Sequence, residues 1–463
     1  MTVHLKLYDQ PSSLHADGSR NFVHPADVRG RFDTRRRWIF AALIAWLAAL
    51  PFWQIGGHPA VFLDFEQRSF YLFGATFNAQ DAWLVFFLLT GLGFALIVVT
   101  ALWGRVWCGY ACPQTVFLEG IFRPIERLIE GPRSERLRRN AGPLSFDKAA
   151  RKLLKHALFL ALSFLVAHLI TAYFVSLPRL YRMVLGSPAA HPEAFIWAFG
   201  LTALLYFDFF WFREQMCLVV CPYGRLQSVL TDHDSLVIGY DERRGEPRGK
   251  KGAAGAGDCV DCKRCVVVCP TGIDIRNGLQ IDCIGCARCA DACDDVMGKL
   301  GRASGLVRYD SQNGFAGKAK RLWRPRLLLY AGLGALGCVV ASLAVASRTP
   351  FEANVLRLRD HPPFVVEGDQ VRNAFEVHLV NKRSGSAVFE LRGLPQGSLR
   401  YTIALPKLSI GELHDQRIPV FVDFPAGSLR AGAAAQLELR IDGRPVRVLS
   451  APLIAPDLRP RHE

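Results

Sequence analysis

The sequence predicts a multi-domain fold class: an α-helical membrane region of about five transmembrane helices, a small cysteine-rich α+β domain, and a C-terminal all-β Ig-like sandwich. Three observations support this prediction. Apolar residues make up 51% of the 463 residues and gather in long runs. Twelve of the 13 cysteines fall in four tight groups. After residue 346, short alternating runs that are typical of strands replace the long apolar ones.

Five apolar runs approach the roughly 20 residues that a helix needs to cross the hydrocarbon core. We predict transmembrane helices at about 38–55, 82–103, 153–177, 194–212 and 327–346. Lys and Arg are concentrated in the segments 1–37, 104–152 and 213–326. The positive-inside rule places these segments in the cytoplasm and 347–463 outside. We therefore expect a multi-pass protein of the bacterial inner membrane with a periplasmic C-terminal domain.

The first 37 residues are polar and end in Arg35-Arg36-Arg37, directly before the first apolar run. This order indicates an uncleaved, cytoplasmic N-terminal tail rather than a signal peptide. The net charge of +15 could indicate a nucleic-acid partner. However, the basic clusters adjoin the apolar runs and no nucleic-acid-binding motif is evident. We therefore attribute the charge to cytoplasmic segments and predict no nucleic-acid partner.

The strongest motif is a pair of similar cysteine runs, Cys259-x2-Cys262-x2-Cys265-x3-Cys269-Pro270 and Cys283-x2-Cys286-x2-Cys289-x3-Cys293. Ligand sets of three thiolates from one run and the fourth from the other are typical of two-cluster ferredoxins. The pattern predicts a 2[4Fe–4S] ferredoxin-like domain at 259–300. We expect one cluster on Cys259, Cys262, Cys265 and Cys293, and the other on Cys283, Cys286, Cys289 and Cys269. Two zinc knuckles are the alternative, but zinc typically uses paired CxxC units that lie further apart.

Two further cysteine pairs follow apolar runs, Cys108-x3-Cys112-Pro113 and Cys217-x3-Cys221-Pro222. Their offset of 109 residues (217 − 108) indicates a duplicated helical hairpin. Residues i and i+4 share one face of a helix, so each pair could present two sulfurs together. Such thiols suit a soft metal such as Cu(I), or a redox role. The alternative is that they are buried and inert.

Four other residues are weaker candidates. Cys338 stands alone in an apolar run, and we interpret it as a small buried hydrophobe. Met216 could be a soft ligand beside the second pair, although a lone Met more often packs. His156 and His168 could ligate haem, but no matched histidine pair lies on another helix. We therefore expect ordinary hydrogen-bonded roles for both histidines.

The C-terminal region contains short runs with partial alternation at 371–380, 387–391, 417–424, 436–441 and 446–449. Gly, Pro and Asp separate these runs, which predicts an Ig-like antiparallel β-sandwich over 347–463. The Gly-rich, charged segment 241–258 predicts a flexible linker. It would join a four-helix transmembrane region at 38–240 to the cysteine domain. Residues 301–346 would then form a connector and the fifth transmembrane helix.

With these residues in view, the chain resembles the FixG/CcoG (RdxA) family of cytochrome c oxidase accessory proteins. The resemblance covers nearly the whole chain. It rests on GRFDTRRRW before the first helix, WCGYACPQTVFLEGIFRPIERLIEG at 107–131, REQMCLVVCPYGRLQSVLTDHDSLVIGYDERRGEPRG at 213–249, and the cysteine segment 257–300.

The resemblance implies a membrane-bound enzyme, a cupric reductase that reduces Cu(II) to Cu(I) for cbb3-type cytochrome c oxidase assembly. It implies two [4Fe–4S] clusters as cofactors on the eight cysteines from Cys259 to Cys293, and copper as substrate. Cys108, Cys112, Cys217 and Cys221 are then the expected copper-handling residues; no catalytic residue is identified. Expected partners are the membrane, the oxidase or its copper-delivery proteins, an unidentified cytoplasmic electron donor, and a second copy in a homodimer.

Two other functions fit the residues. The chain could be an electron-transfer subunit resembling membrane polyferredoxins that oxidise quinol, which also carry paired CxxxCP elements. Reduction of the clusters by added quinol would distinguish this function. Alternatively, it could be a non-enzymatic copper-binding assembly factor whose clusters are structural. Such a protein would bind copper tightly without turnover.

Overall fold

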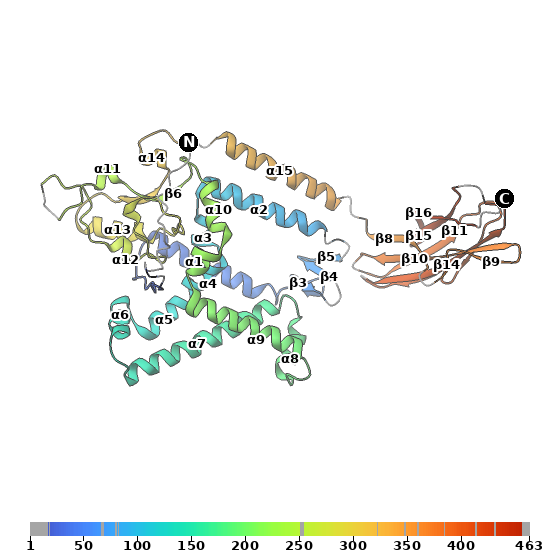
Figure 1. Ribbon diagram of the computed structural model, residues 1–463, viewed down its shortest axis with the longest axis horizontal. Coiled ribbons are helices and arrows are strands. Elements are labelled where there is room, and N and C mark those ends of the chain that lie inside the picture. Colours follow the sequence, from blue (N-terminus) through green and yellow to red (C-terminus); the bar gives the residue numbers. More distant parts are fainter. Residues whose placement is uncertain are drawn as a thin grey trace. The chain divides into compact units, whose positions relative to one another are not determined.

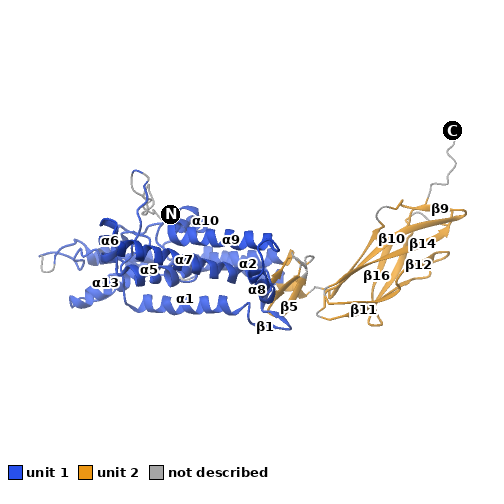
Figure 2. Cartoon of the chain, turned by 90° about the horizontal axis from the view of Figure 1, so that it is seen from below, with its two compact units in different colours: residues 1–62, 85–341 blue, residues 63–84, 342–463 orange. Residues whose placement is uncertain are grey.

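The computed structural model describes residues 17, 19–65, 69–78, 81, 83–250, 254–321, 323–346, 349–358, 361–383, 385–412, 414–429 and 432–455. The chain divides into two compact units (Figure 2). The first is drawn from residues 1–62 and 85–341, and the second from 63–84 and 342–463. All 13 cysteines belong to the first unit.

Four of the described helices are long and apolar enough to cross a membrane. They are α2 (Trp83–Trp103), α7 (Phe146–Thr171), α9 (Pro192–Phe207) continued by the π-helical η3 (Asp208–Phe212), and α15 (Pro325–Ala346). Most side chains along them are not buried within the protein. Helices that are apolar on all sides yet uncovered by protein indicate a membrane protein.

The first predicted span, 38–55, corresponds only in part to helix α1 (Arg31–Ala49). Its first seven residues are RFDTRRR, of which five are charged. For this reason α1 is not among the four helices above. The helix ends at Ala49, and the strands β1 (Gln54–Ile55) and β2 (His58–Pro59) follow. A fifth membrane span stays a prediction.

An aromatic core holds α7 and α9, which lie side by side (Figure 1). The Phe122 ring stacks on Phe209 with centroids 4.3 Å apart and meets Phe159 edge-on at 5.0 Å. Phe122 ends the π-helical η2 (Leu118–Phe122), so this core fastens the segment after α2 to α7 and η3. That segment is helical throughout much of its length, in α3 (Val106–Tyr110), α4 (Pro113–Phe117), η2, α5 (Arg123–Glu130) and α6 (Arg133–Ala141). A further helix, α8 (Leu177–Leu185), precedes α9.

A small antiparallel sheet brackets the cysteine region, because β6 (Val237–Tyr240) pairs with β7 (Val307–Asp310). The elements between and after these strands are α11 (Glu242–Gly245), α12 (Arg264–Val267), η5 (Ile275–Asn277), α13 (Arg288–Lys299) and α14 (Gln312–Phe315). Two short strands with intervening helices form an α+β domain that begins before the first cysteine.

The described part of the predicted linker, 241–258, contains the short helix α11 and bonds to the residues around the first cysteine run. The Gly249 amide donates to the Cys259 carbonyl at 3.1 Å, and the Asp258 amide donates to the Arg244 carbonyl at 3.0 Å. Arg244 also forms an ion pair with Asp258 at 2.5 Å. The composition suggested a linker, but its charged residues bond locally to the first cysteine run. Residues 251–253 lie outside the described part.

The C-terminal region is a β-sandwich of two antiparallel sheets, with strand orders β12-β14-β10-β8 and β13-β11-β15-β16, and β9 pairs with β10. The strands are β8 (Phe351–Arg357), β9 (Val365–Glu367), β10 (Gln370–Asn381), β11 (Ala387–Gly393), β12 (Arg400–Ile403), β13 (Lys407–Ile410), β14 (Asp415–Pro425), β15 (Ala434–Ile441) and β16 (Arg444–Pro452). Alternate residues of the long strands, such as Val377 opposite Ile418, form a buried core.

The five alternating runs expected from the sequence fall within β10, β11, β14, β15 and β16. The strands β8, β9, β12 and β13 were missed, because most of them are short and show little alternation. Also missed was a three-stranded sheet of β3 (Val61–Asp64), β4 (Ser69–Leu72) and β5 (Ala75–Asn78) between α1 and α2.

Candidate metal centres

The two cysteine runs have the same local fold. In each run the residues on either side of the second cysteine have left-handed backbones. Asp261 and Lys263 do so in the first run, with φ of 50° and 53°. Gly285 and Ala287 do so in the second, with φ of 68° and 60°. Three of these four are not glycine, and each costs of order 1 kcal/mol or more. Repeated strain of this kind is typical of ligand-binding loops.

The eight thiols of the two runs form two groups, and each group draws on both runs. In the first group, the thiol of Cys293 lies within electrostatic range of Cys259 and Cys262, and Cys265 lies within range of Cys293. The crossed ligand sets themselves stay a prediction.

In the second group, the thiol of Cys289 lies within electrostatic range of Cys286, Cys283 and Cys269. Cys289 is also within range of Cys265, so the two groups are neighbours. A cavity lies at this point, lined by Cys265 and by all four thiols of the second group.

Most of the eight cysteines are shielded from solvent. Burial raises the pKa of Cys265, Cys283 and Cys293 to about 12. Among the eight cysteines only Cys262, in the first group, is exposed. In the part of the chain that the structure describes, no three Cys, His, Asp or Glu side chains come close enough to hold a single metal ion. The first group is therefore the one that reaches solvent, at Cys262.

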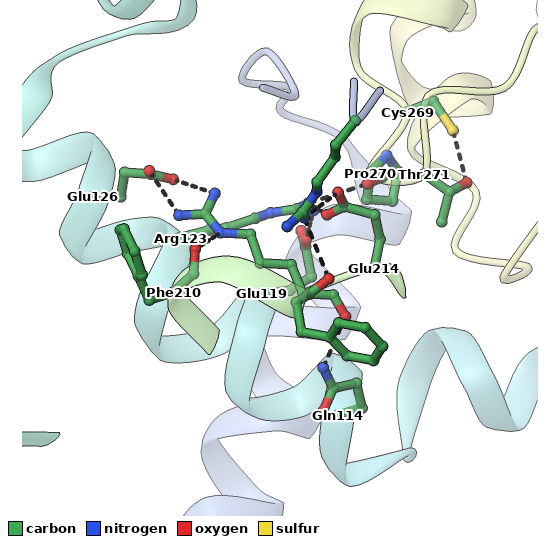
Figure 3. Close-up of polar contacts among 12 residues, drawn as sticks. Gln114, Glu119, Arg123, Glu126, Phe210, Glu214, Cys269, Pro270 and Thr271 are labelled. Atoms are coloured by element: carbon green, nitrogen blue, oxygen red, sulfur yellow. Dashed lines mark hydrogen bonds and ion pairs between the residues drawn. The ribbon is translucent and has the colours of Figure 1, made fainter. Parts of the chain in front are cut away.

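A buried ion network anchors the end of the first cysteine run (Figure 3). Arg123 of α5 donates from Nη2 to the carbonyl of Pro270, next to Cys269, at 3.1 Å. The same Nη2 pairs with Glu214 at 3.0 Å, and Nη1 pairs with Glu119. All three charged side chains are less than 9% exposed. Removing one member of such a network typically costs 3–5 kcal/mol, so the network fixes the cysteine run against α5.

Each CxxxCP pair straddles a helix boundary. Cys108 lies in α3, whereas Cys112 is extended (φ −61°, ψ 127°) and is the N-cap residue of α4. Likewise, Cys217 lies in η4 (Met216–Val220), and Cys221 caps α10 (Pro222–Leu230). The expectation that each pair shares one helix face is wrong. A proline forces the preceding residue out of helical geometry and favours the first position of the next helix.

The two pairs nevertheless come together, and we call Cys108, Cys112, Cys217 and Cys221 the paired thiols. The thiol of Cys217 lies within electrostatic range of the other three. That of Cys108 lies within range of Cys112 and Cys221. Burial raises the pKa of Cys108 to about 11 and also raises that of Cys217. The structure thus brings two distant motifs into one region, although no three of these thiols come close enough to hold a single metal ion.

One glutamine that the sequence analysis missed contacts this group, and a second contacts a carboxylate beside it. The Nε2 of Gln227, which is fully buried, donates to the Sγ of Cys108 at 3.3 Å. The Nε2 of Gln114 donates at 3.1 Å to Asp208, a carboxylate within electrostatic range of Cys217. No motif marks either glutamine, because an amide in a short helix resembles a surface residue. Only its burial beside a thiol could have identified it.

The paired thiols adjoin the second cysteine run through backbone contact. Gly109 directly follows Cys108, and a Cβ atom placed on it would lie 2.8 Å from the Ile284 carbonyl oxygen and 2.9 Å from that of Gly285. Nearby, the Nη1 of Arg105 donates to the Cys283 carbonyl at 3.2 Å. No side chain separates the two backbones, so the chain next to Cys108 packs directly on the second cysteine run.

The remaining candidates show no sign of binding a metal or haem. Cys338 is exposed on α15 rather than buried, because that helix presents most of its side chains outward. Met216 is 37% exposed. The Nδ1 of His156 bonds the hydroxyl of Tyr206 at 2.6 Å, and that of His168 donates to a carbonyl one turn earlier at 2.8 Å. Both histidines thus have ordinary partners.

Three family models match the chain. The 4Fe-4S dicluster domain matches residues 212–312, which contain both cysteine runs. The 4Fe-4S binding domain matches 84–132, where Cys108 and Cys112 are the cysteines present. The IG-like fold at the C-terminal of FixG matches 341–451. The thiols fit this assignment, because two groups of four are the ligands that two [4Fe–4S] clusters need. The chain is thus an iron–sulfur protein with two such clusters and a C-terminal Ig-like sandwich.

Two solved structures resemble part of the chain. A FixG-related protein from Vibrio parahaemolyticus is 12% identical, with 23% of this chain and 97% of that chain covered and a TM-score of 0.19. An apo PmoF2 PCuAC domain is 16% identical, with 24% and 93% covered and a TM-score of 0.17. Scores this low do not establish a shared fold.

Curated relatives match most of the chain. The nitrogen fixation protein FixG of Rhizobium meliloti is 37% identical, with 88% of this chain and 87% of the relative covered. Protein RdxA of Cereibacter sphaeroides is 36% identical, with 93% and 97% covered. Protein RdxB of the same organism is 35% identical, with 85% and 86% covered. At this identity and coverage, the chain belongs to the FixG/RdxA family.

Proposed function

We propose that this protein is a membrane cupric reductase that supplies Cu(I) for the assembly of cbb3-type cytochrome c oxidase. The observation that carries the proposal is the backbone contact of Gly109 with Ile284 and Gly285. This contact supports the proposal because it joins the chain next to Cys108, a thiol that suits a soft metal, to a cysteine run that suits an iron–sulfur cluster. Membership of the FixG/RdxA family supports the same function.

The cysteine runs hold the two clusters in crossed sets, Cys259, Cys262, Cys265 and Cys293 for one and Cys283, Cys286, Cys289 and Cys269 for the other. When bound, the clusters supply one-electron transfer. The exposed Cys262 gives a cytoplasmic reductant a point of approach. The second group has no exposed cysteine, and solvent exclusion is one means by which a protein sets a cluster's potential.

Copper is the substrate, and the paired thiols receive it. Cu(II) prefers nitrogen and oxygen ligands, whereas Cu(I) prefers thiolates, so four sulfurs favour the reduced ion. Each reduction consumes one electron from the cytoplasmic donor and leaves Cu(I) on the thiols. A thiol must release its proton to bind, and the Gln227 amide that donates to Cys108 stabilises the thiolate so formed.

Membrane placement follows from charge. The charged start of α1 and the basic segments 104–152 and 213–326 support a cytoplasmic position for the cysteine domain. Five crossings of the inner membrane then put 347–463 in the periplasm. There the Ig-like sandwich serves as a docking module for the oxidase or for a copper-delivery protein.

Anaerobic purification tests the proposal, with iron and sulfide counting, EPR spectroscopy and a Cu(I)-chelator assay on added Cu(II). The double variant Cys262→Ser with Cys286→Ser should lose turnover. Cys108→Ser with Cys217→Ser should keep the iron of the cysteine runs and also lose turnover. Cys338→Ser, on α15, is the matched control and should behave as wild type. Wild-type turnover in the first double variant would refute the reductase proposal.

The match of a 4Fe-4S binding domain to 84–132 favours a second role for the paired thiols. Four thiols in one group also suffice for a third [4Fe–4S] cluster. The protein would then contain about twelve irons per chain rather than about eight. The variant Cys108→Ser with Cys217→Ser would lose about four of them. Full iron retention in that variant would instead support the copper site.

The same preparation distinguishes the other two functions. Reduction of the clusters by added quinol would favour a quinol dehydrogenase subunit. Stoichiometric copper binding with no reduction of Cu(II) would favour a non-enzymatic assembly factor. Reduction of Cu(II) by a cytoplasmic-type reductant, without response to quinol, is the result that the cupric reductase predicts.

A further inference from the structure

A pocket of about 330 Å³ that no cysteine lines lies where α1 meets η2 and α5. Six arginines line it: Arg36, Arg37, Arg123, Arg127, Arg136 and Arg288. Only three carboxylates, Asp27, Asp33 and Glu119, line it as well. The lining side chains of this space, which we call the arginine pocket, carry three more positive than negative charges, and Glu214 and Glu126 just behind the lining pair with two of the cations, Arg123 and Arg136.

The ion pairs inside the arginine pocket leave one cation without a carboxylate. Glu119 pairs with Arg123 and with Arg288, the latter at 3.0 Å. Arg36 is 2% exposed and donates from Nε to the Gly109 carbonyl at 2.9 Å. Its Nη2 is buried and has no hydrogen-bond partner among the described residues. A buried guanidinium nitrogen without a partner is costly, so an anion in the pocket would stabilise it.

The two outer cations of the arginine pocket have single carboxylate partners. Arg37 pairs with Asp33 at 2.7 Å, and its side chain is 57% exposed. Arg127 pairs with Asp27 at 2.7 Å and is 37% exposed. Both guanidinium groups reach solvent and can turn toward a ligand that enters. The pocket therefore offers one buried and two solvent-exposed cations to the same anion.

The opposite wall of the arginine pocket is apolar. Phe40, Ala41 and Ile44 of α1 line it, together with Gly120 of η2. A Cβ atom on Gly120 would already touch Phe40 at 3.4 Å, so the two elements are in close contact there. Beyond the pocket, α1 continues as an apolar helix with the exposed side chain of Trp46. A ligand that fills this site needs an anionic head and a hydrocarbon part.

We propose that the arginine pocket binds the phosphate headgroup of an anionic phospholipid, with its acyl chains along α1. A free phosphate ion or a nucleotide would satisfy the cations but would leave the apolar wall uncovered. Basic pockets beside transmembrane helices on the cytoplasmic side are known to bind anionic headgroups. Because Arg123 contacts both Glu119 and the Pro270 carbonyl, the bound lipid braces the cysteine domain against α5 (Figure 3).

Lipid retention of the full-length protein tests this proposal. The protein is reconstituted into nanodiscs of phosphatidylcholine, alone or mixed equally with phosphatidylglycerol, and retained lipid is counted by native mass spectrometry after extraction. We expect selective retention of phosphatidylglycerol. The variant Arg37→Gln with Arg127→Gln removes two exposed cations and should weaken that retention about tenfold or more, because each cation near a membrane contributes substantially to anionic lipid binding.

The matched control is Arg151→Gln, which also breaks an exposed ion pair, with Asp147 at 2.7 Å, near the start of a helix but outside the pocket. It should retain the lipid as wild type does. Arg36→Gln should lose the lipid even where the outer cations remain. Equal retention of both lipids, or equal retention in the double variant, would overturn the proposal. So would inorganic phosphate that raises the unfolding temperature as much as phosphatidylglycerol does.

Discussion

Replacing Gly109 by alanine tests the backbone contact between the segment that carries Cys108 and the second cysteine run. The added methyl group would lie 2.8 Å from the Ile284 carbonyl oxygen, 2.9 Å from the Gly285 oxygen and 3.0 Å from the Gly285 carbonyl carbon. All three are backbone atoms, so no flexible side chain can turn aside. The 0.6 Å between 2.8 Å and an ordinary contact of 3.4 Å must come from movement of one segment away from the other.

Two opposing effects set the size of this change. Overpacking against fixed neighbours typically costs 1–3 kcal/mol. Gly109 lies in α3, where alanine is favoured over glycine by about 0.5–1 kcal/mol. The net loss of stability should therefore be about 1–2 kcal/mol, or a fall of a few degrees in unfolding temperature. Turnover should fall as well, because small displacements between reacting groups reduce rates strongly.

Gly298→Ala is the control for Gly109→Ala. Gly298 also lies in a helix, α13, but a Cβ atom there would meet nothing within 4 Å. It should keep or gain stability and keep turnover. The measurements are unfolding temperature in detergent, iron content and the Cu(I)-chelator rate. If Gly109→Ala matched Gly298→Ala in all three, the backbone contact would not exist in the folded protein and the argument from it would be wrong.

Two other predictions concern different parts of the chain. Burial raises the pKa of Glu119, but neighbouring guanidinium groups, Arg123 and Arg288 first, outweigh it and hold the pKa at about 2. The ionised Glu119 therefore stabilises the folded protein by about 3 kcal/mol above pH 4.5, and this stabilisation is lost as the pH falls through 2. Glu119→Gln should lower the unfolding temperature at neutral pH and make it depend less on pH on the acid side. A profile parallel to that of the wild type would contradict this prediction. Phe389→Ala should lower the free energy of unfolding of the sandwich by about 3–5 kcal/mol, because Phe389 lies in its buried core. Iron content and turnover should not change, because the cysteines belong to the other unit. Loss of iron in this variant would show that the two units depend on each other.

Much of the architecture could be predicted from local sequence patterns. The helices α2, α7, α9 and α15 fall on four of the five expected apolar runs, because a span needs only length and apolar composition. The long strands β10 and β14 alternate in burial, and so their runs were recognised. The charged start of α1 and the short edge strands were not predicted correctly. Neither segment has a clear helical or alternating pattern of apolar residues, so neither could be recognised from the sequence beside the stronger runs around it.

By itself, the sequence determined the two cysteine runs and the crossed sets that they imply, because three ligands of each set are neighbours along the chain and their spacing limits the geometry. The tertiary structure alone decided where the paired thiols lie. Two pairs 109 residues apart (217 − 108) meet only when the helices before and after them pack. It likewise decided that Gln227 would face a sulfur and that arginines from α1, α5, α6 and α13 would share one pocket. These contacts depend on burial and on long-range packing, which no local spacing encodes.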